Sequence, residues 1–265
     1  MPVAHVNGQS ISYEDSGGGG PVLLFSHGYL MDSTMWHPQV LALEGLAPDY
    51  RCIRWDERGF GNTVATGPFT YWDSADDGVA LLDELGVDTA VWVGMSQGGF
   101  LSLRAALAHP DRVSALVLVD SQAGVDDEAT LESYRAMEHI VEQGSDDEFA
   151  AVLPLVAAII IGDEAIAAPW IETWKGMDRA GSRPAFDALV ERDDITGRLG
   201  EITCPALVVH GTADAAIPMA RAEALAAGLP GSHGVVPIEG AGHASNLTHP
   251  DLVNPPLIEF LATLT

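Results

Sequence analysis

Short runs of consecutive apolar residues that alternate with helical patterns are the feature of this sequence that most restricts its fold. The runs are apolar at nearly every position, which is typical of strands buried on both faces. Such strands form a mostly parallel sheet with helices on both faces, because parallel neighbours need long crossover connections. We expect strands at residues 22–25, 51–55, 89–93, 113–119, 206–209 and 234–238. We expect helices near residues 35–46, 72–85, 98–108 and 219–227, and a last helix that runs toward residue 264.

Turn and breaker residues shape the two ends of the chain. Residues 2–6 and 10–14 flank Asn7-Gly8, a pair typical of a two-residue β-hairpin. Near the C-terminus, residues 254–256 read Asn-Pro-Pro inside the last helical pattern. Proline within a helix costs about 3 kcal/mol relative to alanine. We therefore expect the helix to break there and to start afresh at Pro255.

The alternation of strands and helices stops between residues 122 and 200. This segment contains helical patterns but no convincing buried strand, and the alternation resumes after it. An insertion of this kind is typical of a cap that lies over the strand ends. We therefore expect an α/β core formed by residues 1–121 and 201–265. Residues 122–200 are expected to form a helical cap inserted after the sixth strand.

The charge balance and the cysteines exclude several classes of partner. The 265 residues include 12 Lys and Arg against 38 Asp and Glu, a formal net charge of −26. Such a chain repels a phosphate backbone or an anionic bilayer, and no apolar run approaches the roughly 20 residues that span a membrane. Cys52 and Cys204 lack metal-ligand spacing, so we expect buried thiols and no metal. We expect a cytoplasmic monomer or homodimer that binds neither nucleic acid nor membrane.

The segment Gly94-Met95-Ser96-Gln97-Gly98 is the strongest local indication of chemistry. It lies directly after a predicted strand and directly before a predicted helix. A Gly-x-Ser-x-Gly sequence at a sharp strand-to-helix turn exposes the serine hydroxyl, and the crowded backbone requires glycine on both sides. The N-terminus of the following helix directs backbone N–H groups toward a negative charge that forms beside the serine. Ser96 is therefore the predicted nucleophile.

A serine hydroxyl needs a base, and the base needs a carboxylate that orients it. Asp214 follows the predicted strand at 206–209, and His243 follows the one at 234–238. Because the carboxyl ends of parallel strands meet at one edge of a sheet, we expect Ser96, Asp214 and His243 to lie together there. Asp120, at the end of the strand at 113–119, is the alternative acid. The other histidines are expected to have structural roles.

Acyl transfer also needs two hydrogen-bond donors for the oxyanion. Tyr29 lies in the loop that follows the strand at 22–25, so its backbone N–H can pair with that of Gln97 across the developing charge. Loss of one such donor typically raises the barrier by about 3 to 4 kcal/mol. The predicted oxyanion hole therefore consists of the backbone N–H groups of Tyr29 and Gln97.

Together these motifs resemble the α/β-hydrolase superfamily. The resemblance rests on His27-Gly28, on residues 56–61 (Asp-Glu-Arg-Gly-Phe-Gly), on the turn at Ser96 and on the loops of Asp214 and His243. It covers nearly the whole chain outside residues 122–200. Within the superfamily, the chain is similar to small bacterial serine esterases, enol-lactonases and cofactor-free haloperoxidases or perhydrolases. The resemblance implies an α/β-hydrolase fold, the triad order Ser, Asp, His, and chemistry without a cofactor.

Several side chains near the nucleophile or in the cap are candidates for substrate binding. Tyr29, Leu30, Met95 and Gln97 neighbour the predicted site, and Ile159 to Ile161 fit an apolar roof. Trp170 and Trp174 are four residues apart on one helical face, which fits either a pocket wall or core packing. The candidates for substrate contact are Tyr29, Leu30, Met95, Ile159, Trp170 and Trp174.

The predicted activity is cleavage of a small, largely apolar carboxylic ester or lactone through an acyl-enzyme on Ser96. Lactone opening is the same chemistry on a cyclic ester, so the sequence does not separate an esterase from a lactonase. Two alternatives stay open. One is a hydrolase-like ligand sensor that turns over slowly. The other is haloperoxidase, perhydrolase or oxygenase activity at the same site without a cofactor.

Overall fold

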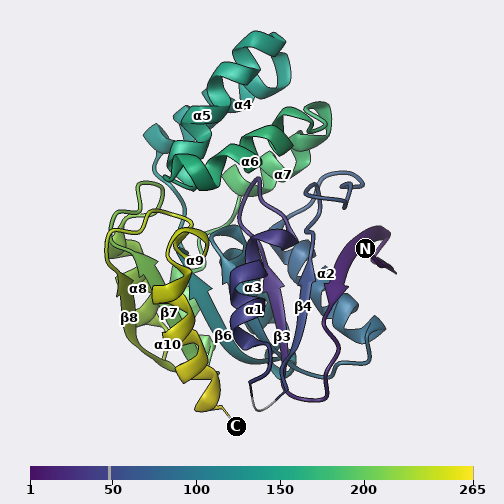
Figure 1. The fold of residues 1–265 in the computed structure, drawn as a ribbon, viewed down its shortest axis with the longest axis vertical. Helices are drawn as coiled ribbons and strands as arrows, with labels where there is room; N and C mark the ends of the chain where they lie inside the picture. Colours follow the sequence, from purple (N-terminus) through teal and green to yellow (C-terminus); the bar gives the residue numbers. More distant parts are fainter. Residues whose placement is uncertain (47–48, 265) are drawn as a thin grey trace.

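The apolar runs form the strands of a single sheet. The computed structural model describes residues 1–46 and 49–264, and within them eight strands pair in the order β1-β2-β4-β3-β5-β6-β7-β8 (Figure 1). β1 and β2 form the predicted antiparallel hairpin, β2 is antiparallel to β4, and the remaining pairs are parallel. The predicted mostly parallel sheet is therefore confirmed. The strands are β1 (Val3–Val6), β2 (Gln9–Asp15), β3 (Val22–Ser26), β4 (Arg51–Trp55), β5 (Ala90–Met95), β6 (Val113–Val119), β7 (Ala206–Gly211) and β8 (Ser232–Ile238).

Helices cover both faces of this sheet, and alternate strand residues pack into two separate cores. Trp92 of β5 packs on the face covered by α2, α3 and α8, together with Leu103 of α3. Its neighbours Val91 and Val93 pack on the opposite face, together with Val40 of α1. Burial on both faces explains why the strands read as continuous apolar runs. The helices of this core are α1 (His37–Leu43), α2 (Tyr71–Glu84), α3 (Gln97–Ala108), α8 (Met219–Gly228), α9 (Ser245–Thr248) and α10 (Pro250–Ala262).

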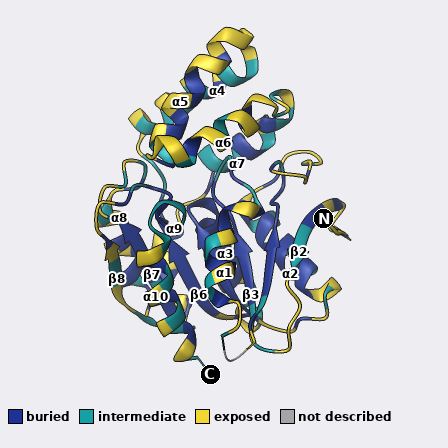
Figure 2. Ribbon diagram, viewed as in Figure 1, coloured by how far each residue is buried: buried dark blue, intermediate teal, exposed yellow. Residues whose placement is uncertain are grey.

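Residues 122–200 are helical and lie above the sheet in Figure 1. Their outward faces are exposed, whereas the strands beneath are buried (Figure 2). Side-chain caps define where three of the helices begin: Asp127, Ser145 and Asp163 each accept a hydrogen bond from a backbone N–H of the first turn. The helices are α4 (Glu128–Gln143), α5 (Asp146–Ile160), α6 (Glu164–Lys175) and α7 (Arg183–Val190).

The expected helix break at Pro255 is wrong. α10 runs from Pro250 to Ala262 and contains both Pro255 and Pro256. The inner face of the helix is buried through Val253, Leu257 and Leu261. Burial of this face stabilises the helical backbone more than the two prolines destabilise it.

Two further contacts reduce the cost of the prolines. Gln39 of α1 donates a hydrogen bond of 2.9 Å from Nε2 to Oδ1 of Asn254, which ties the residue before the prolines to the core. The two carbonyl groups that lose their helical partners belong to Asp251 and Leu252, and both residues are exposed. Water can therefore hydrate these carbonyl groups.

Replacing both prolines, Pro255→Ala with Pro256→Ala, is expected to raise the free energy of unfolding by about 1 to 3 kcal/mol, because two helical hydrogen bonds are restored. Urea denaturation measures the change. Pro250→Ala is the matched control, since a proline at the first helical position needs no hydrogen-bond partner. A double variant no more stable than this control would show that the prolines do not strain α10.

None of the helices in residues 1–46 and 49–264 has the length and apolar character needed to cross a membrane.

Candidate active site

Ser96 lies at the turn between β5 and α3, in a strained backbone conformation. Its φ of 50° falls in the left-handed region, which few residues other than glycine adopt. A Cβ at Gly94 would lie 2.2 Å from the carbonyl oxygen of Gly98, and a Cβ at Gly98 would lie 2.1 Å from that of Ser26. Both glycines are therefore required by close backbone packing. Ser96 itself remains 7% exposed at the tip of the turn.

The loops after β7 and β8 bring a histidine and an aspartate to this serine. His243 Nε2 lies 3.0 Å from Ser96 Oγ, within hydrogen-bond distance. On the other side of the ring, Nδ1 lies 2.8 Å from Asp214 Oδ2. Asp214 is held in turn by the backbone N–H groups of Ala216 and Ile217, which donate to its other oxygen at 2.8 and 2.9 Å. The geometry joins the three predicted side chains in one continuous chain of hydrogen bonds.

His243 and Asp214 stabilise each other's charged forms. Burial disfavours the charged imidazole, but the charge of Asp214 and its hydrogen bond outweigh this, so the pKa of His243 is raised above its usual value. Burial likewise disfavours the Asp214 carboxylate, but the His243 charge and hydrogen bond outweigh it and lower the pKa of Asp214. The pair is therefore suited to holding a proton on the imidazole while Asp214 stays ionised.

Asp120, the alternative acid, has a different set of partners. Its Oδ1 accepts a hydrogen bond of 2.8 Å from the N–H of Gly211, and its Oδ2 accepts one of 2.8 Å from the N–H of Ser245. Burial raises its pKa to about 6. Both oxygens thus join the end of β7 to the start of α9, and His243 is hydrogen-bonded to Asp214 instead.

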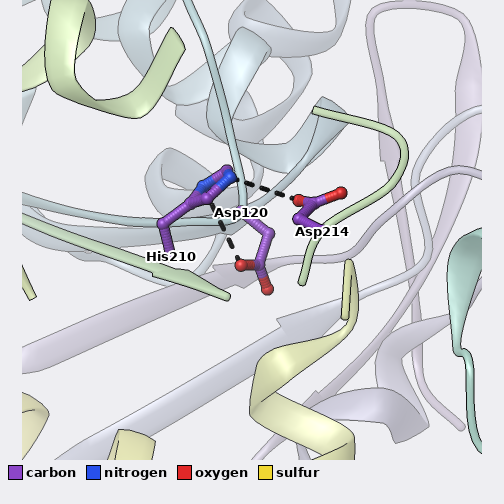
Figure 3. A group of neighbouring side chains, drawn as sticks. All are labelled: Asp120, His210 and Asp214. Atoms are coloured by element: carbon purple, nitrogen blue, oxygen red, sulfur yellow. Dashed lines mark ion pairs between the residues drawn. The ribbon is translucent and has the colours of Figure 1, made fainter. Parts of the chain in front are cut away.

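His210 lies close to both acids, Asp120 and Asp214 (Figure 3). Its Nε2 lies 2.7 Å from the carbonyl oxygen of Ile217 and 3.3 Å from Asp214 Oδ2. A carbonyl oxygen only accepts, so Nε2 carries the proton. The other nitrogen, Nδ1, lies 3.9 Å from Asp120 Oδ1. This group has the composition of a metal site, but its oxygens already accept hydrogen bonds from the protein, and we assign it to the support of the Asp214 loop.

The two predicted oxyanion donors lie in segments with well-defined supports. Gln97 is the first residue of α3, so its backbone N–H has no acceptor within the helix. The loop that carries Tyr29 begins at His27, which accepts a hydrogen bond of 3.0 Å at Nε2 from the N–H of Glu57. His27 Nδ1 lies 2.8 Å from the Gly28 carbonyl, so this histidine is structural, as expected.

A cavity lies between the core and the helices of residues 122–200, and Ser96 and His243 line it. Of the predicted substrate-contacting residues, Tyr29, Leu30, Met95 and Ile159 line this cavity, and so does Ile160. The rest of the wall is mostly apolar and comes from both the core and the cap: Phe100, Met137, Val141, Phe149, Leu153, Val156, Met177, Phe186, Leu189 and Ile217.

The predicted substrate contact of Trp170 and Trp174 gains no support from the cavity. Neither lines the cavity beside Ser96, and both pack in the core between the cap and the sheet. The indole N–H of Trp174 donates a hydrogen bond of 2.6 Å to the carbonyl oxygen of Leu30. Trp174 therefore fastens α6 to the loop that carries Tyr29. The helical spacing alone fits either role, and the direction of the helix face decides it.

The Gln97 side chain also turns away from the cavity. Its Nε2 donates to Glu57 Oε2 at 2.8 Å, and its Oε1 accepts from the Tyr71 hydroxyl at 3.2 Å. Glu57 is fully buried, and this burial raises its pKa well above the usual range. These residues form a polar support beneath the N-terminus of α3.

Sequence reasoning missed four polar residues of the cavity wall: Gln122, Asp126, Tyr134 and Glu138. A signal for Glu138 exists in the sequence. Tyr134, Met137, Glu138 and Val141 have the spacing of one helix face, and three of the four are apolar or aromatic. No comparable signal marks Gln122, because it lies in the loop after β6.

A parallel sheet, a serine at a sharp strand-to-helix turn and a helical insertion above the strand ends define the α/β-hydrolase class of proteins. The chain belongs to this family, because the family model described as alpha/beta hydrolase fold matches residues 21–164. A second model, described as TAP-like protein, matches residues 187–265. The resemblance inferred from the motifs is therefore confirmed.

Relatives named for different activities match 91% or more of the chain. A protein from Agrobacterium fabrum that carries the name carbamate hydrolase RutD is 30% identical, over 91% of this chain and 93% of its own. An esterase from Thermogutta terrifontis is 29% identical with a TM-score of 0.83, over 100% of this chain and 97% of its own. The enol-lactonase of Burkholderia xenovorans is 26% identical with a TM-score of 0.88, over 98% and 100%.

Proposed function

We propose that the protein is a serine hydrolase that cleaves a small, uncharged and largely apolar carboxylic ester or lactone. The observation that carries this proposal is the continuous hydrogen-bonded chain from Ser96 Oγ through His243 to Asp214, placed at the wall of an apolar cavity. In the proposal, residues 122–200 act as a cap that shapes the acyl or alcohol pocket. A cytoplasmic location and a monomeric or homodimeric state remain predictions from the sequence.

The proposed reaction proceeds in two acyl-transfer steps. Ser96 Oγ attacks the ester carbonyl carbon while His243 Nε2 takes the hydroxyl proton, and the N–H groups of Tyr29 and Gln97 stabilise the oxyanion. The tetrahedral intermediate collapses, the C–O bond to the alcohol breaks, and His243 returns the proton to the leaving oxygen. Water then attacks the acyl-enzyme with His243 as base, which releases the acid and restores Ser96. Asp214 keeps the imidazole in the required tautomer throughout.

Turnover on a panel of aryl esters and lactones of increasing acyl length tests the proposal. We expect multiple turnovers, and we expect an alkyl fluorophosphonate to add to Ser96 with loss of activity. Peptide mapping by mass spectrometry locates the added mass. A single turnover without further release would support the ligand-sensor alternative, and labelling of a residue other than Ser96 would contradict the assignment.

A carbamate is the second candidate substrate. The relative named carbamate hydrolase favours it, since attack on a carbamoyl carbon uses the same nucleophile, base and oxyanion donors. Carbamate analogues of the best ester belong in the same panel. Faster release of amine from these analogues than of acid from the esters would favour the carbamate. Peracid formed in the presence of hydrogen peroxide would indicate perhydrolase activity, because peroxide then replaces water in deacylation.

The pH dependence of kcat/KM is expected to show a loss of activity on the acid side. His243 acts as a base only when it is neutral, and its pKa is raised above the usual 6.5. Activity is therefore retained above this pKa and falls about tenfold per pH unit below it. A pH series with an aryl ester measures the profile. A flat profile from pH 5 to 8 would contradict the role of His243 as the base.

A further inference from the structure

The cap presents to the cavity an acid that the proposed reaction does not use. α4 places Tyr134, Met137, Glu138 and Val141 along the cavity wall, on one face of the helix. The structure describes every residue of α4, and among them Glu138 alone is buried, with 6% exposed. Glutamate is rarely buried without a compensating partner. A buried carboxyl in the middle of this face therefore requires an explanation.

The protein satisfies this carboxyl only in part. In residues 1–46 and 49–264, Ser182 is the one group hydrogen-bonded to Glu138, with Oγ 3.1 Å from Oε1, and no lysine or arginine is ion-paired with it. The Ser182 hydroxyl also lies 2.8 Å from the carbonyl oxygen of Arg179 and has a single proton to donate. Burial raises the pKa of Glu138 to about 7, and the charge of Glu142 adds to this. Oε2 keeps a free lone pair whether or not the carboxyl is protonated.

Gln122 also lines the cavity. Its Nε2 donates a hydrogen bond of 3.0 Å to Asp126 Oδ1, and this carboxylate fixes the orientation of the amide, because it requires a donor. The amide oxygen Oε1 is buried and has no partner in the described part of the chain. Asp126, in turn, is ion-paired with Arg192 at 2.8 Å. The amide oxygen of Gln122 and the ionised carboxylate of Glu138 are thus both acceptors.

The remaining wall gives these acceptors no counterpart. Among the described residues that line the cavity, none is a lysine or an arginine, and two are acids, Asp126 and Glu138. A substrate carboxylate would therefore face two acids and no cation. A plain alkyl chain would leave the Glu138 oxygen without a partner. Neither of these substrates gives the Glu138 carboxylate a hydrogen bond. A substrate with a hydrogen-bond donor on its chain does so.

We propose that Glu138 is a specificity-determining residue that selects esters or lactones whose otherwise apolar chain carries an uncharged hydrogen-bond donor, a hydroxyl or an amide N–H. This inference rests on the proposed ester or lactone hydrolysis. The donor binds Oε2 of Glu138 inside the cavity, while the ester carbonyl lies at Ser96. Discrimination against the same chain without the donor is expected to be about 10- to 100-fold in kcat/KM, the effect of losing one hydrogen bond to a buried carboxyl.

The test compares p-nitrophenyl octanoate with a series of p-nitrophenyl esters that carry one hydroxyl on successive carbons of the same chain. For the wild type, we expect kcat/KM for the best hydroxy ester to exceed that of the plain ester. Glu138→Leu is expected to lower this ratio about 10- to 100-fold. Glu138→Gln keeps an acceptor oxygen and is expected to retain part of the ratio.

Two further variants separate recognition from a structural role. Ser182→Ala removes the hydrogen bond to Glu138 but leaves the carboxyl, so the ratio is expected to persist. Glu142 lies one turn further along α4 and does not line the cavity. Its charge raises the pKa of Glu138, so Glu142→Gln favours the Glu138 carboxylate and is expected not to lower the ratio. If either variant lowers the ratio as much as Glu138→Leu does, Glu138 supports the cap and does not select the substrate.

A change in the substrate alone provides a test that does not depend on the folding of any variant. Replacing the hydroxyl of the best ester by a methoxy group removes the donor and keeps the oxygen. We expect kcat/KM of the wild type for the methoxy ester to fall below that for the hydroxy ester, to the level of the plain ester. Equal kcat/KM for the hydroxy and methoxy esters would overturn the inference. If the protein turns over esters and is labelled at Ser96, but Glu138→Leu leaves the ratio of kcat/KM for the hydroxy ester to that for the plain ester unchanged, this inference alone is overturned. Absence of both turnover and labelling would overturn the proposed function as well.

Discussion

Ser96→Ala is expected to lower kcat on an aryl ester by roughly 10⁴- to 10⁶-fold, the range seen when the nucleophile of a serine triad is removed. The effect is large because the covalent route is lost, and the remaining groups stabilise only attack by water. Initial rates with p-nitrophenyl esters under saturating conditions measure it. The variant is expected to fold normally, because alanine keeps the Cβ at the strained turn.

A matched control for this variant is Ser133→Ala. Ser133 is an exposed serine on α4 whose hydroxyl donates only to the carbonyl of Ala129. It is expected to retain wild-type kcat and to remain unlabelled by the fluorophosphonate. Equal rates for wild type and Ser96→Ala on every ester and lactone tested would show that Ser96 is not the nucleophile.

Asp214→Asn is expected to lower kcat by about 10³- to 10⁴-fold, because an amide next to His243 Nδ1 favours the wrong imidazole tautomer. The substitution preserves size, so the loss reports the charge and the hydrogen-bond direction. The acid limb of the pH profile is also expected to move to lower pH, since the carboxylate that raises the His243 pKa is gone. Rates and pH profiles of the purified variant measure both effects.

Asp120→Asn is the matched comparison for Asp214→Asn. Both oxygens of Asp120 accept backbone hydrogen bonds, so the amide leaves one N–H without an acceptor, which costs about 1 to 3 kcal/mol of stability. We expect a lower Tm with less than about a tenfold change in kcat, since Asp120 is not bonded to His243. The reverse pattern, with Asp120→Asn inactive and Asp214→Asn active, would make Asp120 the acid of the triad.

The local sequence was sufficient for the turn at Ser96 and for the strands that position the site. Gly94 and Gly98 are required by backbone contacts within the turn and with the neighbouring β3 strand, and a requirement of this kind leaves a fixed spacing in the sequence. The acid and the histidine were predictable for a related reason. Loops that follow consecutive parallel strands converge at one edge of the sheet.

The last helix and the cap show where local reasoning failed. Pro255 and Pro256 predict a break, yet α10 continues because its buried face packs against the core. Trp170 and Trp174 share a helix face, but only the position of α6 shows that this face packs on the core and on the loop of Leu30. A spacing specifies which residues share a face, and the packing of the helix decides what that face contacts.

The sequence by itself therefore determined the class of fold, the order of the predicted nucleophile, acid and base along the chain, and the apolar segment at Ile159 to Ile161. These properties depend on short-range sterics and on the periodicity of burial, which neighbouring residues encode. Only the tertiary structure decided which residues of 122–200 line the cavity, what the Trp170 and Trp174 face of α6 packs on, and that Glu138 faces the cavity from α4. Each of these depends on contacts between segments far apart in the chain, and the periodicity of a single segment carries no information about its partner.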